Sequence, residues 1–581
     1  MKGVYFILFV LCALAIYQVC TTRQCALAGN ESVLLQWQVE DDGHALVYER
    51  SRLLFMMAEY TDAMVIFPAD FKKEEAGLRW PLLDDSTLSL IGLQKFPARK
   101  IASGKKWQHN GRARIIHNEM ISEPIGFALN FSFANLTTEN QQSIAEIHFT
   151  GQAKNIDPKL QMKNIRVEGK YSFNVSAGRL DEFNGTVKYE AVEGEDGDTR
   201  EQNGACALKW RQTLEFKGDE LDQLIADAIK ECADALAGNQ DADGYIGDAV
   251  SKESHPMGSC ALALLALLKS GADKDSPVVQ KAFAYLRNLP LKKTYSVSLL
   301  CMAIEAFYTP LDELKNSEKD FAKESIKRKQ RVLSPVYKNW MTQAVNWLVT
   351  NQGKPGSWTY CPEDGKAFDN SNSQYAVLGL YAAARCGVFA EPKHWQAILK
   401  HWLNTQQQKG EVYERIITVG DKRRSVVKRR AQARGWAYLE AKTDQVTYTM
   451  TCGGVSSVAI ALACLQQVNK GSAKSLARAA QASIQSGLAW LEKNYTLRQE
   501  HIPMWYVYYM YGFERACVLN QTRYLGLRDW YREGAAILCT QPKLGNKNPS
   551  LSRWGEPIGT SFILLFLKRA TVPLSSVTTG K

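Results

Sequence analysis

The second half of the chain carries apolar residues at the three- and four-residue spacing of helices. Six of the expected helices are rich in small and apolar residues, and the run from Ala261 to Leu268 is apolar on every side. A helix of that kind has to be surrounded by other helices. These inner helices are expected at 258–270, 294–308, 372–385, 449–466, 505–518 and 559–570.

A more amphipathic helix precedes each inner helix. These outer helices are expected at 220–237, 277–288, 334–351, 393–405, 475–493 and 527–541. Helix pairs that bury one member form either an open solenoid or a closed ring. Six pairs with an apolar inner set favour closure, so the sequence predicts an all-α (α/α)6 toroid over residues 216–575, followed by a short tail at 576–581.

Residues 29–215 alternate instead with a period of two, as in 126–133 and 164–175. This pattern predicts an antiparallel β-rich domain with one buried face, either a sandwich or a partial barrel. The pair Asn184-Gly185 is typical of a hairpin turn. The acidic stretch 193–198 is expected to be a linker or loop before the helices.

The first 28 residues resemble a targeting segment. Lys2 precedes an apolar run from Val4 to Cys20, and Ala26-Leu27-Ala28 matches the small-residue pattern of a cleavage site. We therefore expect a cleavable signal peptide and an exported protein, whether periplasmic, in the envelope or secreted. The alternative is an uncleaved membrane anchor, because the apolar run is just long enough to span a thin bilayer.

A repeated motif follows several outer helices. Its best copy reads W-L-x-x-x-Q-x-x-x-G-x-W from Trp347 to Trp358. Gln352 falls where helix-end carbonyls need donors, and Gly356 allows a turn. Imperfect copies, which point to a structural role in fixing helix ends, are Gln240 with Gly244 and Tyr245, Gln406 with Gly410 and Tyr413, and Gln541 with Gly545 and Trp554.

Composition and charge narrow the function classes. With 45% hydrophobic and 23% charged residues, the chain is that of a folded protein. Its net charge of +11 includes a basic cluster at 422–434. An exported protein seldom meets nucleic acid, so this cluster is either a solvated loop or a contact for an anionic envelope surface. The cysteines are scattered and without C-x-x-C spacing, as small buried hydrophobes are.

With its Gln-Trp-like repeats, the helical part resembles the terpenoid cyclase and protein prenyltransferase α/α-toroid superfamily. It is most similar to the prenyltransferase and squalene-oxidase repeat-containing proteins of exported bacterial type, through the stretches 508–516, 529–535 and 560–569. The resemblance implies a toroid with a central cavity. It is poor evidence for an activity.

The catalytic motifs of those relatives are absent from this sequence. No D-x-D-D acid motif occurs, since Asp241-Ala242-Asp243-Gly244 stops short of it. No Asp-x-Cys pair with a distant His is present to hold zinc, so we expect neither a metal nor a cofactor. The stretch Thr451-Cys452-Gly453-Gly454 also lacks the Gln of an internal thioester.

The loops that lead into the inner helices should converge on one rim, where helix N-termini are positive. For Asp369 and its neighbours an N-cap is the favoured interpretation. For Glu514 with Arg515 a structural ion pair is favoured over a pocket-lining acid. Trp505 and Tyr508 form either an aromatic cavity wall or simple core. The pocket candidates are His255, Asp369, Asn370, Asn372, Gln374, Tyr448, Cys452, Trp505, Tyr508, Glu514, Arg515 and Glu556.

Two functions remain open at this point. The first is a binding or scaffold protein without activity, whose cavity or rim takes a peptide, a glycan or a lipid-like ligand. The alternative is an enzyme that uses Asp369 or Glu514 as a non-standard acid on an isoprenoid or a polysaccharide. The volume and lining of the cavity, and whether two carboxylates face each other in it, discriminate between them.

Overall fold

The computed structural model divides the chain into two compact units, one of residues 1–116 with 121–218 and one of residues 117–120 with 219–581. The expected signal peptide lies outside the described residues. The structure describes residues 32–33, 53–60, 63–68, 101–113, 116–117, 120–121, 125–154, 156, 162–176, 179–193, 198–217, 219–310, 330–364, 368–419, 425–439, 445–497, 502, 505–526, 528–540, 556–571 and 574.

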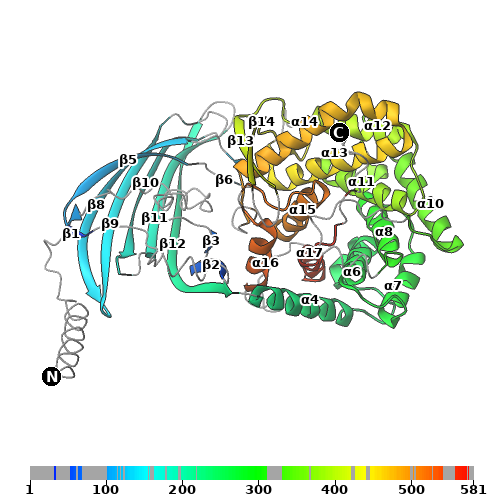
Figure 1. Cartoon of the computed structure of the whole chain (residues 1–581), viewed down its shortest axis with the longest axis horizontal. Coiled ribbons are helices and arrows are strands. Elements are labelled where there is room, and N and C mark those ends of the chain that lie inside the picture. Colours follow the sequence, from blue (N-terminus) through cyan, green and yellow to red (C-terminus); the bar gives the residue numbers. More distant parts are fainter. Residues whose placement is uncertain are drawn as a thin grey trace, which may run out of the picture. The chain divides into compact units, whose positions relative to one another are not determined.

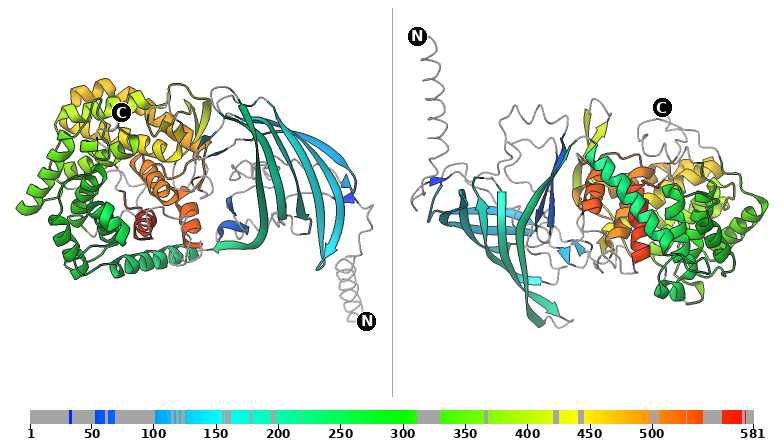
Figure 2. Two further views of the ribbon diagram at one scale, coloured as in Figure 1. Left: turned by 180° about the vertical axis from the view of Figure 1, so that it is seen from behind. Right: turned by 90° about the horizontal axis from the view of Figure 1, so that it is seen from below.

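The first unit is built on one antiparallel sheet of eight strands, in the order β3-β2-β12-β11-β10-β9-β8-β5. Figures 1 and 2 show that this sheet is curved. The predicted antiparallel β-rich region is thereby confirmed. The strands are β2 (Leu53–Tyr60), β3 (Ala63–Pro68), β5 (Lys106–Ala113), β8 (Ile125–Glu139), β9 (Gln142–Lys154), β10 (Met162–Asn174), β11 (Arg179–Glu193) and β12 (Asp198–Lys217). Two short pairs, β1 (Ser32–Val33) with β4 (Ile101–Ala102) and β6 (Ile116–His117) with β7 (Met120–Ile121), lie outside this sheet.

One face of the sheet is buried, as the period of two requires. In β8, Phe127, Leu129, Phe131 and Phe133 are at most 2% exposed, while the residues between them are more accessible. Aromatic rings continue this core across neighbouring strands, since Phe149 stacks on Phe183 with 5.6 Å between ring centroids. Such cross-strand pairs are what stabilises a sheet.

Two local predictions in the first unit are wrong. Asn184 and Gly185 do not form a hairpin turn but lie within β11, where they pair with β10 on one side and β12 on the other. Gly185 faces Gly169 across the strands, and a Cβ on Gly169 would lie 2.3 Å from the Asn184 carbonyl oxygen, so close backbone approach explains the glycines. The acidic stretch connects β11 to β12 instead of linking the two units.

The second unit contains the six predicted helix pairs. Figure 1 shows the outer helices at the periphery of this unit and the inner helices toward its middle. The inner helices are α6 (Pro256–Ser270), α8 (Thr294–Phe307), α11 (Asn370–Arg385), α13 (Tyr448–Val468), α15 (Tyr506–Leu519) and α17 (Glu556–Leu567). The outer helices are α4 (Glu220–Gly238), α7 (Pro277–Arg287), α10 (Pro335–Thr350), α12 (Pro392–Thr405), α14 (Lys470–Lys493) and α16 (Trp530–Thr540). Short helices α5 (Ala249–Ser254) and η2 (Pro362–Asp364) lie in connections.

The inner helices pack side by side. Helix α6 contacts α8, α8 contacts α11, α11 contacts α13, α13 contacts α15, and α15 contacts α17, which also contacts α6. Nearly every described residue of α6, α11, α13 and α15 is buried, whereas α7 and α12 bury one side only. Helix α13 is the one described helix long and apolar enough to cross a membrane. Its most apolar segment is 94% buried inside the protein, as expected of a core helix.

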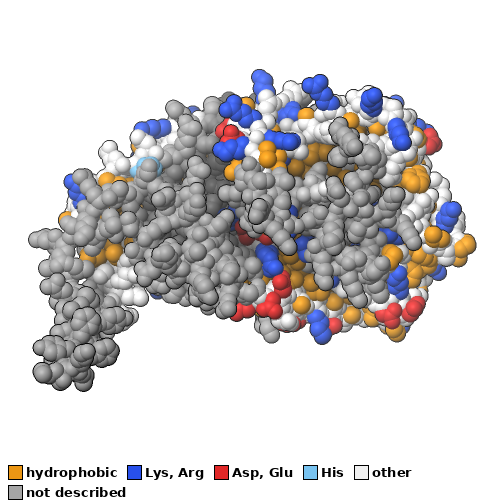
Figure 3. Space-filling view, viewed as in Figure 1, with side chains coloured by type: hydrophobic (Ala, Val, Ile, Leu, Met, Phe, Trp, Pro, Cys, Tyr) orange, Lys and Arg blue, Asp and Glu red, His pale blue; other side chains and the backbone are white. Residues whose placement is uncertain are grey.

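A β-hairpin that the sequence analysis missed follows α12. Strand β13 (Val412–Val419) pairs with β14 (Ser425–Gln432), and β15 (Trp436–Ala437) pairs with β16 (Val446–Thr447) before α13 begins. The basic cluster at 422–434 is therefore in part a strand and not a loop. Lys428, Arg429 and Arg430 are exposed on β14. In Figure 3, Lys and Arg side chains are spread along the upper edge of the helical unit, over β13, β14 and α14.

Candidate functional site

The motif from Trp347 to Trp358 joins three segments of the helical unit. The indole Nε1 of Trp358 donates to the Leu348 carbonyl near the end of α10, at 2.8 Å. The Gln352 amide donates to the His394 carbonyl in the first turn of the next outer helix, α12, at 3.4 Å. Gly356 has a φ of +114°, and a Cβ there would lie 2.4 Å from the Ala397 carbonyl carbon of α12. The motif therefore locks one outer helix to the next.

The imperfect copies do the same. Gln240 donates to the Val278 carbonyl of α7 at 2.8 Å, and Gln406 donates to the Ser483 carbonyl of α14 at 3.1 Å. The aromatic partner predicted for Gln406 is wrong. Tyr413 lies in β13, and Trp436 takes the place of the motif's second Trp by donating to the Trp402 carbonyl at 2.8 Å. The copy from Gln541 to Trp554 lies outside the described residues.

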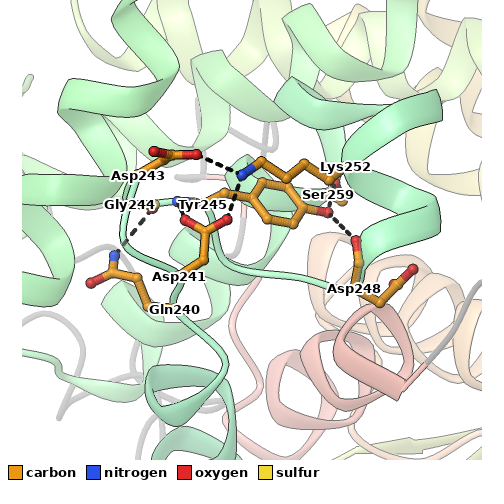
Figure 4. Close-up of polar contacts among 8 residues, drawn as sticks. All are labelled: Gln240, Asp241, Asp243, Gly244, Tyr245, Asp248, Lys252 and Ser259. Carbon is orange, nitrogen blue, oxygen red and sulfur yellow. Dashed lines mark hydrogen bonds and ion pairs between the residues drawn. The ribbon is translucent and has the colours of Figure 1, made fainter.

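The motif copy at Gln240 also contains Asp241 and Asp243, and its contacts show whether these two carboxylates could act as an acid or as a cation site. Figure 4 shows the Lys252 ammonium between the two carboxylates, with Nζ 2.5 Å from Asp241 Oδ2 and 2.9 Å from Asp243 Oδ2. The Tyr245 hydroxyl hydrogen-bonds Ser259 at 2.9 Å and the Asp248 carbonyl. Lys252 bridges both carboxylates through ion pairs, so this turn has a structural role.

Within the part of the chain that the structure describes, no group of three His, Cys, Asp or Glu side chains could hold a metal ion. The cysteines described there are free thiols, and all except Cys361 and Cys539 are buried. Burial raises the pKa of Cys232 and Cys260 to about 12, which keeps both thiols protonated and unreactive at neutral pH.

The polar residues at the start of α11 form a cap. The carboxylate of Asp369 accepts from the Asn372 backbone N at 2.7 Å and from the Asn372 side-chain amide at 2.9 Å. Asn370 donates to the Ala437 and Leu439 carbonyls, and its oxygen contacts the buried His401 ring at 2.9 Å. Burial raises the pKa of Asp369 to about 6 against these hydrogen bonds. Capping accounts for the cluster.

The other predicted rim residues do not converge on one site. His255 is exposed at the start of α6, and Tyr448 packs against Trp490 and Tyr509. Cys452 is buried in α13, Trp505 is the N-cap residue of α15, and Glu556 begins α17.

Three predicted residues do come together across the helical unit. Tyr508 of α15 accepts from the Gln374 amide of α11 at 2.5 Å, and its hydroxyl lies 3.0 Å from Ser371 Oγ and 3.2 Å from the Tyr295 hydroxyl of α8. Arg515 Nη2 then donates to Gln374 Oε1 at 3.1 Å. This polar chain crosses between α8, α11 and α15 and ends at the Arg515 guanidinium.

Glu514 and Arg515 do not form the ion pair that was one reading of the sequence. Glu514 instead accepts hydrogen bonds from the backbone N and the hydroxyl of Thr571, at 3.0 and 2.5 Å. Burial raises the pKa of Glu514 to about 7, against those hydrogen bonds and the nearby charges of Arg515 and Arg569. The carboxyl thus holds the segment after α17 against α15.

A cavity of about 50 Å³ lies at the C-terminal ends of α6, α8, α11 and α15. Arg515 is the only predicted pocket residue that lines it. Met302, Tyr381, Arg385 and Thr571 are partly exposed, and the other lining residues are buried. The lining consists of Leu265, Lys269, Met302, Glu305, Leu378, Tyr381, Ala382, Arg385, Tyr511, Arg515, Leu519, Ala570 and Thr571.

Among the described residues of this lining, Glu305 is the one carboxylate, and three cations surround it. Its oxygens lie 3.1 Å from Lys269 Nζ, 2.9 Å from Arg385 Nη2 and 3.4 Å from Arg331 Nη2. Although burial alone would raise the pKa of Glu305, Arg385, Lys269 and Arg331 together lower it to about 2. Sequence reasoning missed this cluster, although a Glu inside the apolar helix α8 was a signal of the kind that singled out Glu514.

Comparison with known proteins adds no assignment: the chain matches no family model. No curated protein matches it significantly either.

Proposed function

We propose that the helical unit is an (α/α)6 toroid of the terpenoid cyclase and prenyltransferase kind, and that it belongs to an exported binding or scaffold protein without catalytic activity. The packing of each inner helix on the next, with α17 against α6, supports a closed ring. The glutamine hydrogen bonds that link the outer helices α4 to α7, α10 to α12 and α12 to α14 also support a closed ring.

The volume and the lining of the cavity support the proposal that the protein has no catalytic activity. Ligand pockets of enzymes that enclose drug-sized molecules measure roughly 300–1,000 Å³. The cavity beside Arg515 measures about 50 Å³, which suits a small group and not an isoprenoid chain. Glu305, the carboxylate in the described lining, is held ionised by three cations, so it is no proton donor at neutral pH.

The runner-up is an enzyme that uses Asp369 or Glu514 as an acid. The raised pKa values of these two groups, about 6 and about 7, favour it, since both carboxyls are protonated in part near neutral pH. Neither side chain lines the cavity, and both are engaged in hydrogen bonds that hold backbone in place. The structural role is therefore the better account of each.

Incubation with squalene, with farnesyl diphosphate and with a polysaccharide panel tests the proposal. We expect no product from the purified full-length protein. A product that Asp369→Asn or Glu514→Gln abolishes, while the variant keeps its helical circular dichroism spectrum, would overturn it. Fractionation tests export, for which we expect the mature chain to begin at Gly29; a protein that retains Met1 to Ala28 would contradict cleavage.

A further inference from the structure

We propose that the surface formed by helix α14 and the β13–β14 hairpin binds an anionic lipid membrane. We call this surface the basic face. Its six exposed cations are Lys428, Arg429 and Arg430 on β14, and Lys470, Lys474 and Arg478 on α14. The inference goes beyond the proposed function and holds whether or not the protein has catalytic activity.

The positive charge of the chain is concentrated in the segment that contains the basic face. Residues 391–493 contain 16 Lys and Arg against 7 Asp and Glu, which is +9 of the chain's net +11. The other 478 residues together carry only +2. The four acids that the structure describes in this segment each form an ion pair with a nearby Lys or Arg; they are Glu391, Glu411, Glu414 and Glu492. The excess charge is therefore local and positive.

Helix α14 carries a row of cations that helix stability does not explain. Lys470, Lys474 and Arg478 are four residues apart, so they lie along one side of the helix. All three are exposed, and within the described part of the chain none of them forms an ion pair. Like charges at this spacing repel, and the N-terminal end of a helix, where Lys470 and Lys474 lie, disfavours positive charge. An external anion accounts for the row.

The hairpin extends the row of cations past the middle of α14. Arg415 of β13 joins the two elements, with Nε 3.0 Å from Glu492 Oε2 and Nη1 2.6 Å from Gln485 Oε1. Glu414 is the one acid on the two strands and lies 2.8 Å from Lys428. The charges of the exposed Arg429 and Arg430 are therefore in excess. Figure 3 shows Lys and Arg side chains along this edge of the helical unit.

The residues between the cations indicate the kind of partner. The other exposed residues of α14 are small or polar, namely Gly471, Ser475, Ala479, Gln481, Ala482 and Gln485. A folded protein is held mainly by large aromatic or apolar anchors, and a single-stranded nucleic acid by aromatic stacking. The exposed side of α14 has neither, so it depends on charge alone.

The length of the basic face fits a membrane surface. From Lys470 to Gln485, where Arg415 contacts the helix, α14 spans about 22 Å at 1.5 Å per residue. Anionic headgroups move within the plane of a bilayer and can gather beneath cations at this spacing. Each Lys or Arg near such a surface strengthens binding about fivefold. Because the apolar side of α14 packs against α13, the helix stays outside the lipid.

Acetylation of lysines in the full-length protein, measured site by site by mass spectrometry, tests the inference. Vesicles that contain phosphatidylglycerol are compared with vesicles of phosphatidylcholine alone. We expect Lys470 and Lys474 to react at least about fivefold more slowly on the anionic vesicles. Lys281 of α7 and Lys338 of α10 are exposed and lie outside the basic segment, so they should react equally on both. Binding through the apolar N-terminal run needs no anionic lipid and does not produce this difference.

A triple variant tests the row on α14 through the hairpin. With Lys470→Gln, Lys474→Gln and Arg478→Gln, half-maximal protection of Lys428 should need at least about tenfold more anionic lipid. Lys281→Gln, Lys292→Gln and Lys338→Gln remove the same charge from exposed sites elsewhere in the helical unit and should leave that value unchanged. Circular dichroism verifies that both variants fold, and the wild-type acetylation pattern decides the question without them.

The inference is wrong if Lys470 and Lys474 react equally on the two kinds of vesicle, or if the two triple variants weaken the protection of Lys428 equally. It is also wrong if duplex DNA or a sulfated polysaccharide protects these lysines more than anionic vesicles do at equal charge concentration. Those results would leave the non-catalytic function standing. Turnover of an isoprenoid or polysaccharide would instead remove the proposed function and leave the membrane contact standing.

Discussion

The indole Nε1 of Trp358 donates a 2.8 Å hydrogen bond to the Leu348 carbonyl oxygen, ten residues earlier in the chain. This bond closes the turn after α10 and satisfies a carbonyl that the end of a helix leaves without an intrahelical donor. Trp436 and Trp402 repeat the relationship after α12. The motif's Trp is therefore a cap for the outer helix.

Trp358→Phe should lower the free energy of unfolding by about 2 kcal/mol or more, because it leaves a buried carbonyl unpaired and removes part of a fully buried ring. Urea unfolding followed by circular dichroism measures the loss. Trp340→Phe in the same outer helix, where the ring is only half-buried, is the control and should cost less. Equal losses would contradict the capping role.

Gly356→Ala should destabilise the protein by about 2 kcal/mol or more, since a Cβ would collide with α12 and the φ of +114° is strained for alanine. Gly353→Ala in the same turn is the matched control. Its Cβ would meet nothing closer than the Ser357 carbonyl at 3.5 Å, so we expect a change within about 0.5 kcal/mol. Thermal unfolding of the two variants checks the contrast.

Glu305→Gln should lower the free energy of unfolding by about 3–5 kcal/mol at pH 7, because it leaves buried cations without their carboxylate. The pKa of Glu305 is lowered to about 2 from an ordinary value of 4.5. Its contribution is thus present above pH 4.5 and is lost as the pH falls toward 2. Denaturant unfolding between pH 7 and pH 3 should show the wild type approaching the variant, and a constant difference would contradict this.

Glu514→Gln should have the opposite pH dependence. The pKa of Glu514 is raised to about 7, so the folded state binds more protons than the unfolded state between pH 4.5 and 7. Wild-type stability from this group therefore falls as the pH rises through that window. The variant lacks this loss, and its stability relative to the wild type should increase from pH 4.5 to 7. A flat difference would show that Glu514 is ionised in the fold throughout.

Periodicity was enough to find the helices, because each has one apolar side or is apolar throughout. The predicted range 294–308 compares with α8 at Thr294–Phe307, and 393–405 with α12 at Pro392–Thr405. The predicted first residue of a helix is less accurate where the sequence analysis does not identify the capping residue. Helix α14 begins at Lys470 and not at 475, because the Asn469 side chain accepts from the Ser472 backbone N at 3.0 Å.

The cavity could not be found from local pattern. Lys269, Glu305 and Arg385 belong to three different inner helices, and only the packing of those helices side by side brings them together. The sequence predicts a pocket at the N-terminal ends of the inner helices, whereas the cavity lies at the C-terminal ends of α6, α8, α11 and α15. The hairpin of β13 and β14 is inserted between Gln406 and Trp436. The two residues are therefore too far apart in the sequence for the motif spacing to identify Trp436 as the partner.

A crystal structure of the full-length protein tests the central claim, the closed ring, most directly. We predict six helix pairs in a closed ring, with α17 packed against α6. An open arrangement of the pairs would contradict the toroid.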